Sequence, residues 1–249
     1  MSALVQAELL KIRTTRARWA YLTLIVVLTA IGTAGEIGSS ESANRSTLSF
    51  QLGLIDTVGV SVLFAIIVGI TIVTTEFRHG TVTPTFLAEP HRERVLFAKA
   101  IAATIVAIVF ALLSLAVLAA VAIPWLTIVD AQLQLGDAEF LTRTGEQIFS
   151  TVLWALLGVA IGTAVQNQVA ALVGTLMWIF LVENLLVGLL GLADADRIGE
   201  YLPFHALDAA DGAGGDNLLS YGSGLAVTVG WILLLGGFGT WRTIRRDIS

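Results

Sequence analysis

Six apolar stretches, each close to twenty residues long, alternate with polar segments along this chain. They are residues 19–35, 57–75, 100–123, 148–165, 169–192 and 221–241. A helix rises 1.5 Å per residue, so about 20 residues cross the roughly 30 Å of hydrocarbon in a bilayer. The stretches lack the alternation of apolar and polar residues that marks barrel strands. The pattern therefore predicts an all-α polytopic membrane protein with six transmembrane helices.

Composition agrees with this prediction and excludes an ordinary soluble domain. Hydrophobic residues make up 56% of the chain and charged residues 13%, against about 45–50% and about 25% in soluble proteins. The mean hydropathy is +0.84. The chain has no cysteine, which excludes disulfides, thiol catalysis and cysteine metal ligands.

Charge is divided unequally between the two sets of polar segments. One set holds eleven of the fourteen basic residues: Lys11, Arg13, Arg16, Arg18, Arg78, Arg92, Arg94, Lys99, Arg242, Arg245 and Arg246. The other set holds most of the acidic residues. Because basic segments stay on the cytoplasmic side, both termini are predicted to be cytoplasmic. The net charge of −5 is an average over two opposite faces, so it gives no support for nucleic-acid binding.

The first eighteen residues precede the first apolar stretch and contain neither Gly nor Pro. Residues 2–18 are predicted to form an interfacial amphipathic helix, with Val5, Leu9 and Ile12 on its apolar side. A plain basic extension is the alternative. Gly32-Thr33-Ala34 could also end a cleaved signal peptide, but an uncleaved anchor fits the alternation of the later segments better.

Two short patterns predict how the helices pack. Only Gln166, Asn167 and Gln168 separate the fourth and fifth stretches, so these helices should form a tight cytoplasmic hairpin. Gly158 and Gly162 form a G-x-x-x-G pattern that lets a neighbouring helix approach closely. The outer segments 36–56, 130–147 and 193–220 are polar, and none of them is expected to fold as a domain.

The segment from Glu76 to Lys99 lies between the second and third helices and is the most informative part of the chain. Gly80 interrupts its first part, threonines and Pro84 limit its middle, and a basic helix is expected after Pro90.

This segment resembles the cytoplasmic loop of type 2 ATP-binding-cassette (ABC) exporter permeases, where an acidic residue, a Gly-Thr pair and an Arg-rich approach to the third helix recur. The amphipathic leader, the six helices and Leu202-Pro203 after the fifth helix agree with the resemblance. It implies a coupling helix that contacts an ATPase through the residues Glu76, Phe77, Arg78, His79, Gly80 and Thr81. The alternative is that Arg78 and His79 only anchor the second helix at the headgroups. Arg92, Arg94 and Lys99 are expected to be such anchors.

The chain itself contains no G-x-x-x-x-G-K-[ST] phosphate loop. We therefore expect no ATPase site here, and ATP and Mg on a separate cytoplasmic ABC ATP-binding subunit. Six helices are half of such an exporter, so the resemblance implies a second copy or a homologous permease. It also implies export of a lipid, a drug or an amphipathic peptide, and we expect a multi-pass protein of a bacterial plasma membrane.

Glu183 is the one ionisable residue deep inside an apolar stretch. A carboxylate at that depth needs a partner or a wet cavity. Glu183, with Asn184 as its local partner, is thus either a transport-path residue or a structural polar node. A secondary transporter that uses Glu183 as a proton site, and a membrane scaffold or sensor, remain alternative functions.

No metal site is expected from the sequence. Asp208, Asp211 and Asp216 miss the spacing of a calcium loop. His79, His91 and His205 belong to different loops, so they form no zinc cluster.

Overall fold

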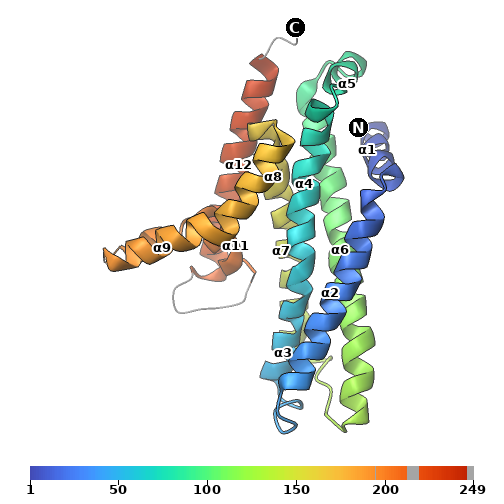
Figure 1. Ribbon diagram of the computed structural model, residues 1–249, viewed down its shortest axis with the longest axis vertical. Helices are drawn as coiled ribbons and strands as arrows, with labels where there is room; N and C mark the ends of the chain where they lie inside the picture. The colour runs from blue at the N-terminus through green and yellow to red at the C-terminus, as the bar shows by residue number, and fades with distance from the viewer. Residues whose placement is uncertain (194, 212–218, 246–249) are drawn as a thin grey trace.

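The computed structural model describes residues 1–193, 195–211 and 219–245, and every regular element within these residues is helical. Figure 1 shows a long bundle in which four helices run side by side. They are α2 (Ala17–Ser39), α4 (Val60–Arg78), α6 (Arg92–Ile128) and α7 (Ala138–Val165). Two more helices, α8 (Gln168–Met177) and α12 (Tyr221–Arg245), pack along one side of this bundle.

The prediction of six membrane-spanning helices is confirmed. Within the described residues, six helices are long and apolar enough to cross a bilayer: Ala17–Ser39, Leu48–Arg78, Arg92–Ile128, Ala138–Val165, Gln168–Leu192 and Tyr221–Arg245. Most of them extend past the apolar stretches of the sequence. Helix α3 (Leu48–Asp56), for example, continues through the 3₁₀ turn Thr57–Gly59 into α4. The Thr47 side chain caps α3 by accepting a hydrogen bond from the Phe50 N–H at 3.4 Å.

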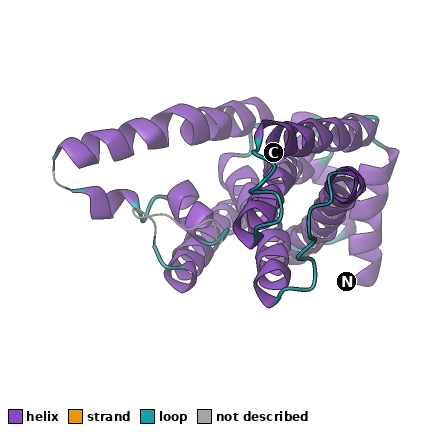
Figure 2. Cartoon of the chain, turned by 90° about the horizontal axis from the view of Figure 1, so that it is seen from below, coloured by secondary structure: helices purple, strands orange, loops and turns teal. Residues whose placement is uncertain are grey.

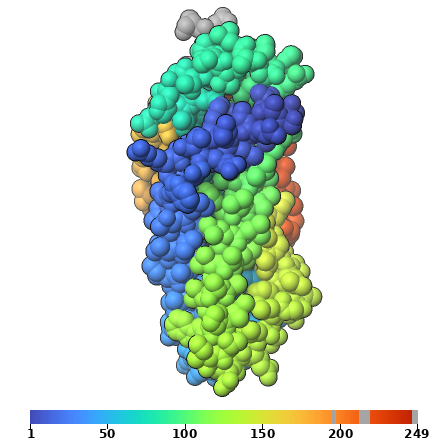
Figure 3. All heavy atoms as spheres, turned by 90° about the vertical axis from the view of Figure 1, so that its right-hand side faces the viewer, coloured from blue at the N-terminus to red at the C-terminus, as the bar shows by residue number. Residues whose placement is uncertain are grey.

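One end of the bundle gathers the basic segments, and we call it the basic end. It holds α1 (Ser2–Thr14), α5 (Val82–Ala88), the start of α6 and the end of α12. Helix α1 stops at Thr14, before α2 begins at Ala17. Figure 3 shows α1 lying across α6 instead of continuing along the bundle. A helix in this orientation can lie in the plane of the membrane surface.

Helices α4 and α7 touch backbone to backbone at three glycines. A Cβ atom added to Gly69 would lie 2.1 Å from the Ala155 carbonyl oxygen. Added to Gly158 it would lie 2.4 Å from the Ile66 oxygen, and added to Gly162 it would lie 2.9 Å from the Ile70 oxygen. The G-x-x-x-G pattern of α7 thus faces α4, where only glycine fits. Small residues permit such approach in membrane bundles, because the attraction there comes from van der Waals contact.

The hairpin between α7 and α8 is as tight as its three-residue spacing requires. Gln166 ends α7 in the left-handed conformation with φ of 58°. The Asn167 side chain then caps α8 by accepting a hydrogen bond from the Ala170 N–H at 3.0 Å.

The fifth spanning helix is bent, which the hydropathy pattern did not indicate. A π-helical segment, Trp178–Val182, separates α8 from α9 (Glu183–Leu192). After it, α9 turns away from the bundle, as Figure 1 and the view along the bundle in Figure 2 both show. Such π segments are rare and lie mostly at kinks and functional sites.

The described residues 195–211 of the outer segment are more ordered than its polar sequence indicated. They contain α10 (Asp196–Gly199) and α11 (Pro203–Ala209). Helix α11 buries Phe204 and Leu207 in the largest core cluster, together with Trp154 of α7. The centres of the Phe204 and Trp154 rings are 5.2 Å apart, so α11 packs back onto the bundle.

We predict that Gly158→Ala destabilises the bundle, because the new methyl group meets the backbone of α4. Overpacking of this kind lowers the free energy of unfolding by about 1–3 kcal/mol. Gly174→Ala in α8 is the matched control, since a Cβ at Gly174 has no neighbour within 4 Å. Alanine favours helix over glycine, so the control should be equally or more stable. Thermal denaturation in mild detergent measures both, and equal midpoints for the two variants would contradict close α4–α7 packing.

Candidate functional site

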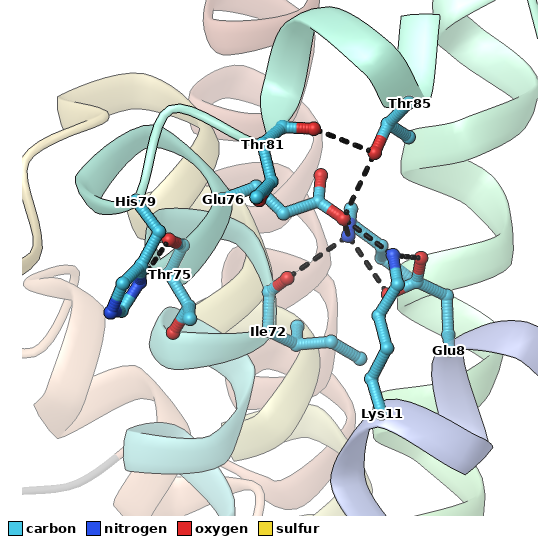
Figure 4. A network of polar contacts seen from close by, with 9 residues as sticks. Glu8, Lys11, Ile72, Thr75, Glu76, His79, Thr81 and Thr85 are labelled. Atoms are coloured by element: carbon cyan, nitrogen blue, oxygen red, sulfur yellow. Dashed lines mark hydrogen bonds and ion pairs between the residues drawn. The ribbon is translucent and has the colours of Figure 1, made fainter. Parts of the chain in front are cut away.

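Four charged side chains from three helices meet at the basic end. Glu8 and Lys11 come from α1 and Glu76 from the last turns of α4, as labelled in Figure 4. Lys99 comes from α6. The Lys99 Nζ atom lies 2.8 Å from Glu8 Oε2 and 3.0 Å from Glu76 Oε1. The Lys11 Nζ atom lies 2.7 Å from Glu8 Oε1 and 2.6 Å from Glu76 Oε1. Each ammonium thus bridges both carboxylates, and we call this group the charge cluster.

Burial makes the charge cluster important for the fold. Lys99 is only 2% exposed, Glu8 4% and Glu76 6%. The Lys99 ammonium also donates a hydrogen bond to the Ile72 carbonyl oxygen at 3.1 Å. An unpaired charge in such surroundings costs several kcal/mol, whereas two cations and two anions cancel. Lys11 and Lys99 are the only two lysines of the chain.

Lys11 lies at the open side of the charge cluster, with its side chain 49% exposed. Burial lowers the pKa of Lys11, but the hydrogen bonds from its ammonium to Glu76 and Glu8 outweigh that effect, so its pKa is raised above the ordinary value. Lys11 therefore stays protonated at physiological pH and keeps α1 attached to α4.

Helix α4 ends just beyond Glu76 in a Schellman motif. The Thr81 N–H donates to the Glu76 carbonyl oxygen at 3.0 Å, and the Gly80 N–H donates to the Phe77 oxygen at 3.5 Å. Gly80 has a φ of 67°, a left-handed conformation that strains any residue with a Cβ. The motif reverses the chain sharply and leads it into α5.

Helix α5 stands at the extreme of the basic end (Figure 1). Its inner side is fixed, because Phe86 is buried and the Arg92 guanidinium lies 5.2 Å from the Phe86 ring centre. Its outer side is open, and Leu87 is 78% exposed. The outer side of α5 is therefore accessible at the basic end.

The predicted coupling residues divide into two groups. Glu76 belongs to the charge cluster and Phe77 packs against the cluster of apolar residues between α4, α6 and α7. Arg78, His79, Gly80 and Thr81 are exposed. The Arg78 Nη1 donates to Gln168 Oε1 at 3.2 Å, and His79 Nδ1 lies 2.9 Å from the Thr75 oxygen. Glu76 therefore fixes the end of α4 from the interior of the bundle, and the exposed surface consists of Arg78, His79, Gly80 and Thr81.

The expected headgroup anchors also behave differently from one another. Arg94 is exposed near Glu89, with 3.9 Å between the charged atoms. Arg92 donates hydrogen bonds to the Thr243 and Ile244 carbonyl oxygens at the end of α12. Lys99 is not an anchor in the headgroups, because it is buried in the charge cluster.

Sequence reasoning missed Glu8 and Lys11 as members of the site. A signal was present, since Glu8 is the only acidic residue among the four basic residues of the first eighteen. Lys99 gave a second signal, because it begins a stretch that contains no other charge as far as Asp130. Nothing in the spacing, however, pairs residues that are 91 positions apart.

Glu183 forms a second buried polar group, on the side of the bundle where α9 departs. Its side chain is 1% exposed. Oε1 accepts hydrogen bonds from the Phe204 N–H at 3.0 Å and the His205 N–H at 2.7 Å, and lies 3.0 Å from His205 Nδ1. Oε2 accepts from Trp178 Nε1 at 2.6 Å. The carboxylate thus joins the π segment to the start of α11, which favours a structural node over a transport-path residue.

Asn184 is not the partner of Glu183. Its amide nitrogen donates to the Ile179 carbonyl oxygen at 2.9 Å, five residues earlier. The π segment widens the helix there, and the Asn184 side chain points along it instead of toward Glu183.

One face of α7 carries a row of buried polar groups that the sequence analysis did not select. Arg143, Gln147 and Trp154 follow helical spacing, and each has a buried polar atom without a hydrogen-bond partner in the described part of the chain. Arg143 Nη2 donates a hydrogen bond to Asp56 Oδ1 at 2.7 Å, while its Nη1 has no hydrogen-bond partner among the described residues. Buried donors of this kind are usually satisfied by ordered water, so this part of the bundle should be hydrated.

The structure groups no three histidine, aspartate or glutamate side chains in the geometry of a metal site among the residues it describes. Asp216, of the acidic outer segment, and Arg246, of the basic C-terminal segment, lie outside those residues. A comparison with models of protein families and with curated proteins finds no match to this chain.

We predict that Lys99→Met destabilises the protein, since it leaves two buried carboxylates with one ammonium. Loss of one partner of a buried ion pair costs about 3–5 kcal/mol. Adding Glu8→Gln to Lys99→Met should recover part of this loss, because it restores the balance of charge. Chemical denaturation of both variants, with exposed Arg94→Met as the control, tests this. A double variant less stable than Lys99→Met would contradict the charge cluster.

For Glu183→Gln we expect local loosening of α11. The amide nitrogen of glutamine cannot accept, so either Trp178 or the N–H groups of Phe204 and His205 lose their partner, at about 1–3 kcal/mol each. Hydrogen exchange of residues 203–209 should become faster. Exposed Glu36→Gln makes the same chemical change without these partners. Unchanged exchange in Glu183→Gln would show that the carboxylate does not hold α11.

Proposed function

We propose that this chain is the transmembrane permease subunit of an ATP-driven exporter of the type 2 ABC class, working with a separate cytoplasmic ATP-binding subunit. The observation that best supports the proposal is the segment Arg78–Thr81 with α5. It presents exposed Arg78, His79 and Leu87 at the extreme of the basic end. Its base is fixed by the Schellman motif and by Glu76 of the charge cluster.

The same contacts explain how a partner at this surface moves the bundle. Displacement of α5 acts on the end of α4, to which Glu76 belongs. Through Lys11 and Lys99 the displacement reaches α1 and α6. Through Gly69 of α4 it reaches α7. Hydrolysis itself takes place on the partner, which holds ATP and Mg.

A second permease, identical or homologous, completes the transporter in this proposal. Helices α8 and α9 and the π segment between them present large apolar side chains on their free side, including Phe180, Leu185 and Leu189. The second permease packs near this side, and the cargo passes between the two subunits. An apolar surface of this kind suits a lipid, a drug or an amphipathic peptide that enters from the bilayer of a bacterial plasma membrane.

We predict that the tagged chain, purified from its native host in mild detergent, co-purifies with an ATPase that carries a phosphate-binding loop. Arg78→Glu should reduce the amount of this ATPase at least about fivefold, because charge reversal at an interface typically costs more than 1 kcal/mol. Mass spectrometry of the eluate and ATP hydrolysis by the eluate give the two readouts.

Arg16→Glu is the matched control, since Arg16 is exposed at the junction of α1 and α2, outside the proposed surface. It should retain the ATPase. Absence of any ATPase from a folded wild-type preparation would overturn the permease proposal. Equal loss in Arg16→Glu and Arg78→Glu would place the contact elsewhere on the basic end.

A further inference from the structure

A cavity of about 860 Å³ lies beneath the junction of α1 and α2, between these helices and α4 and α6. Its size falls in the range of about 300–1,000 Å³ that is usual for ligand pockets. The cavity reaches the lipid-facing side of α6, where Ile105 and Val109 are exposed. An occupant can therefore come directly from the bilayer.

The inner wall of this cavity is mostly apolar. Val68 and Ile72 of α4 form one side, and Val106 and Phe110 of α6 form the other. Leu22 of α2 also lines it. Tyr21 and Thr71 also line the cavity, but apolar side chains predominate, so the wall suits a hydrocarbon chain.

The rim at the basic end is cationic. Arg13 of α1, Arg18 of α2 and Arg78 of α4 all line it. None of the three forms an ion pair with any residue that the structure describes. The two carboxylates that also line the cavity, Glu8 and Glu76, are already neutralised by Lys11 and Lys99. The rim therefore keeps a positive charge that is not balanced within the site.

We propose that this cavity binds an anionic phospholipid of the cytoplasmic leaflet. The acyl chain lies along the wall formed by α4 and α6, and the phosphate is held by Arg13 and Arg18 at the level of the headgroups. The Arg18 guanidinium lies 5.0 Å from the ring centre of Trp19. Tryptophan residues are enriched at the membrane interface, which places Arg18 at the level of the headgroups. Basic groups there attract anionic lipids. The site needs only this chain and does not depend on an ATPase.

The test uses the wild-type chain, delipidated in detergent and titrated with dioleoyl phosphatidylglycerol or dioleoyl phosphatidylcholine, with bound lipid counted by native mass spectrometry. Phosphatidylglycerol should bind at least about tenfold more tightly, and Arg13→Gln/Arg18→Gln should remove most of this preference. The control variant Arg16→Gln/Arg94→Gln removes the same amount of charge outside the cavity, and it should retain the preference for phosphatidylglycerol. Arg78 is left unchanged, so that the ATPase contact and the lipid site are tested separately.

A second variant tests the apolar wall. Ile72→Trp fills the cavity and should reduce binding of phosphatidylglycerol at least about tenfold, while circular dichroism verifies that the chain is folded. Glycerol 1-phosphate, which lacks acyl chains, should not displace the lipid at equal concentration. Equal affinity for the two lipids, equal loss in both double-arginine variants, or full binding by folded Ile72→Trp would each overturn the proposal.

Discussion

A lysine buried among apolar helices is the constraint on which the basic end of this protein depends. Lys99 is almost fully inaccessible, and its charge is tolerable only because Glu8 and Glu76 lie within 3.0 Å of it. Those two carboxylates in turn require Lys11. To bring the four groups together, α1 must lie across α6, and α4 must end beside both. The position of the amphipathic leader is therefore set by electrostatics as much as by its apolar side.

The charge cluster and the close contact of α4 with α7 at three glycines stabilise different parts of the bundle. The charge cluster fixes the peripheral helix α1 to α4 and α6 where water is near. Glycines 69, 158 and 162 fix α4 to α7 in the interior, where close backbone contact provides the attraction. Helix α4 takes part in both, so it connects the exposed segment at the basic end with the core. The proposed lipid site lies beside this same helix.

Much of the fold could be predicted from the sequence, because hydropathy and charge asymmetry act locally. The six helices, the hairpin at Gln166–Gln168 and the interruption at Gly80 all follow from short-range rules. The partners of Glu76 could not be predicted in this way, since Glu8 and Lys99 are far from it in the chain and only the packing of helices brings them together. The packing of α11 against the bundle could not be predicted either, because Phe204 and Leu207 are too few to form an apolar stretch. The π segment at Trp178–Val182 leaves no mark on hydropathy at all.

The contact between α4 and α7 restricts the kind of motion that this bundle can perform. With carbonyl oxygens of one helix seated against the glycines of the other, a slip by one helical turn of about 5.4 Å would force side chains into positions where only hydrogen fits. Towards the opposite end, the Ser61 and Thr151 hydroxyl groups lie 3.4 Å apart and Arg143 of α7 pairs with Asp56 at 2.7 Å. Helices α4 and α7 should therefore move as one unit, and any change of shape in the bundle should occur between this pair and the other helices.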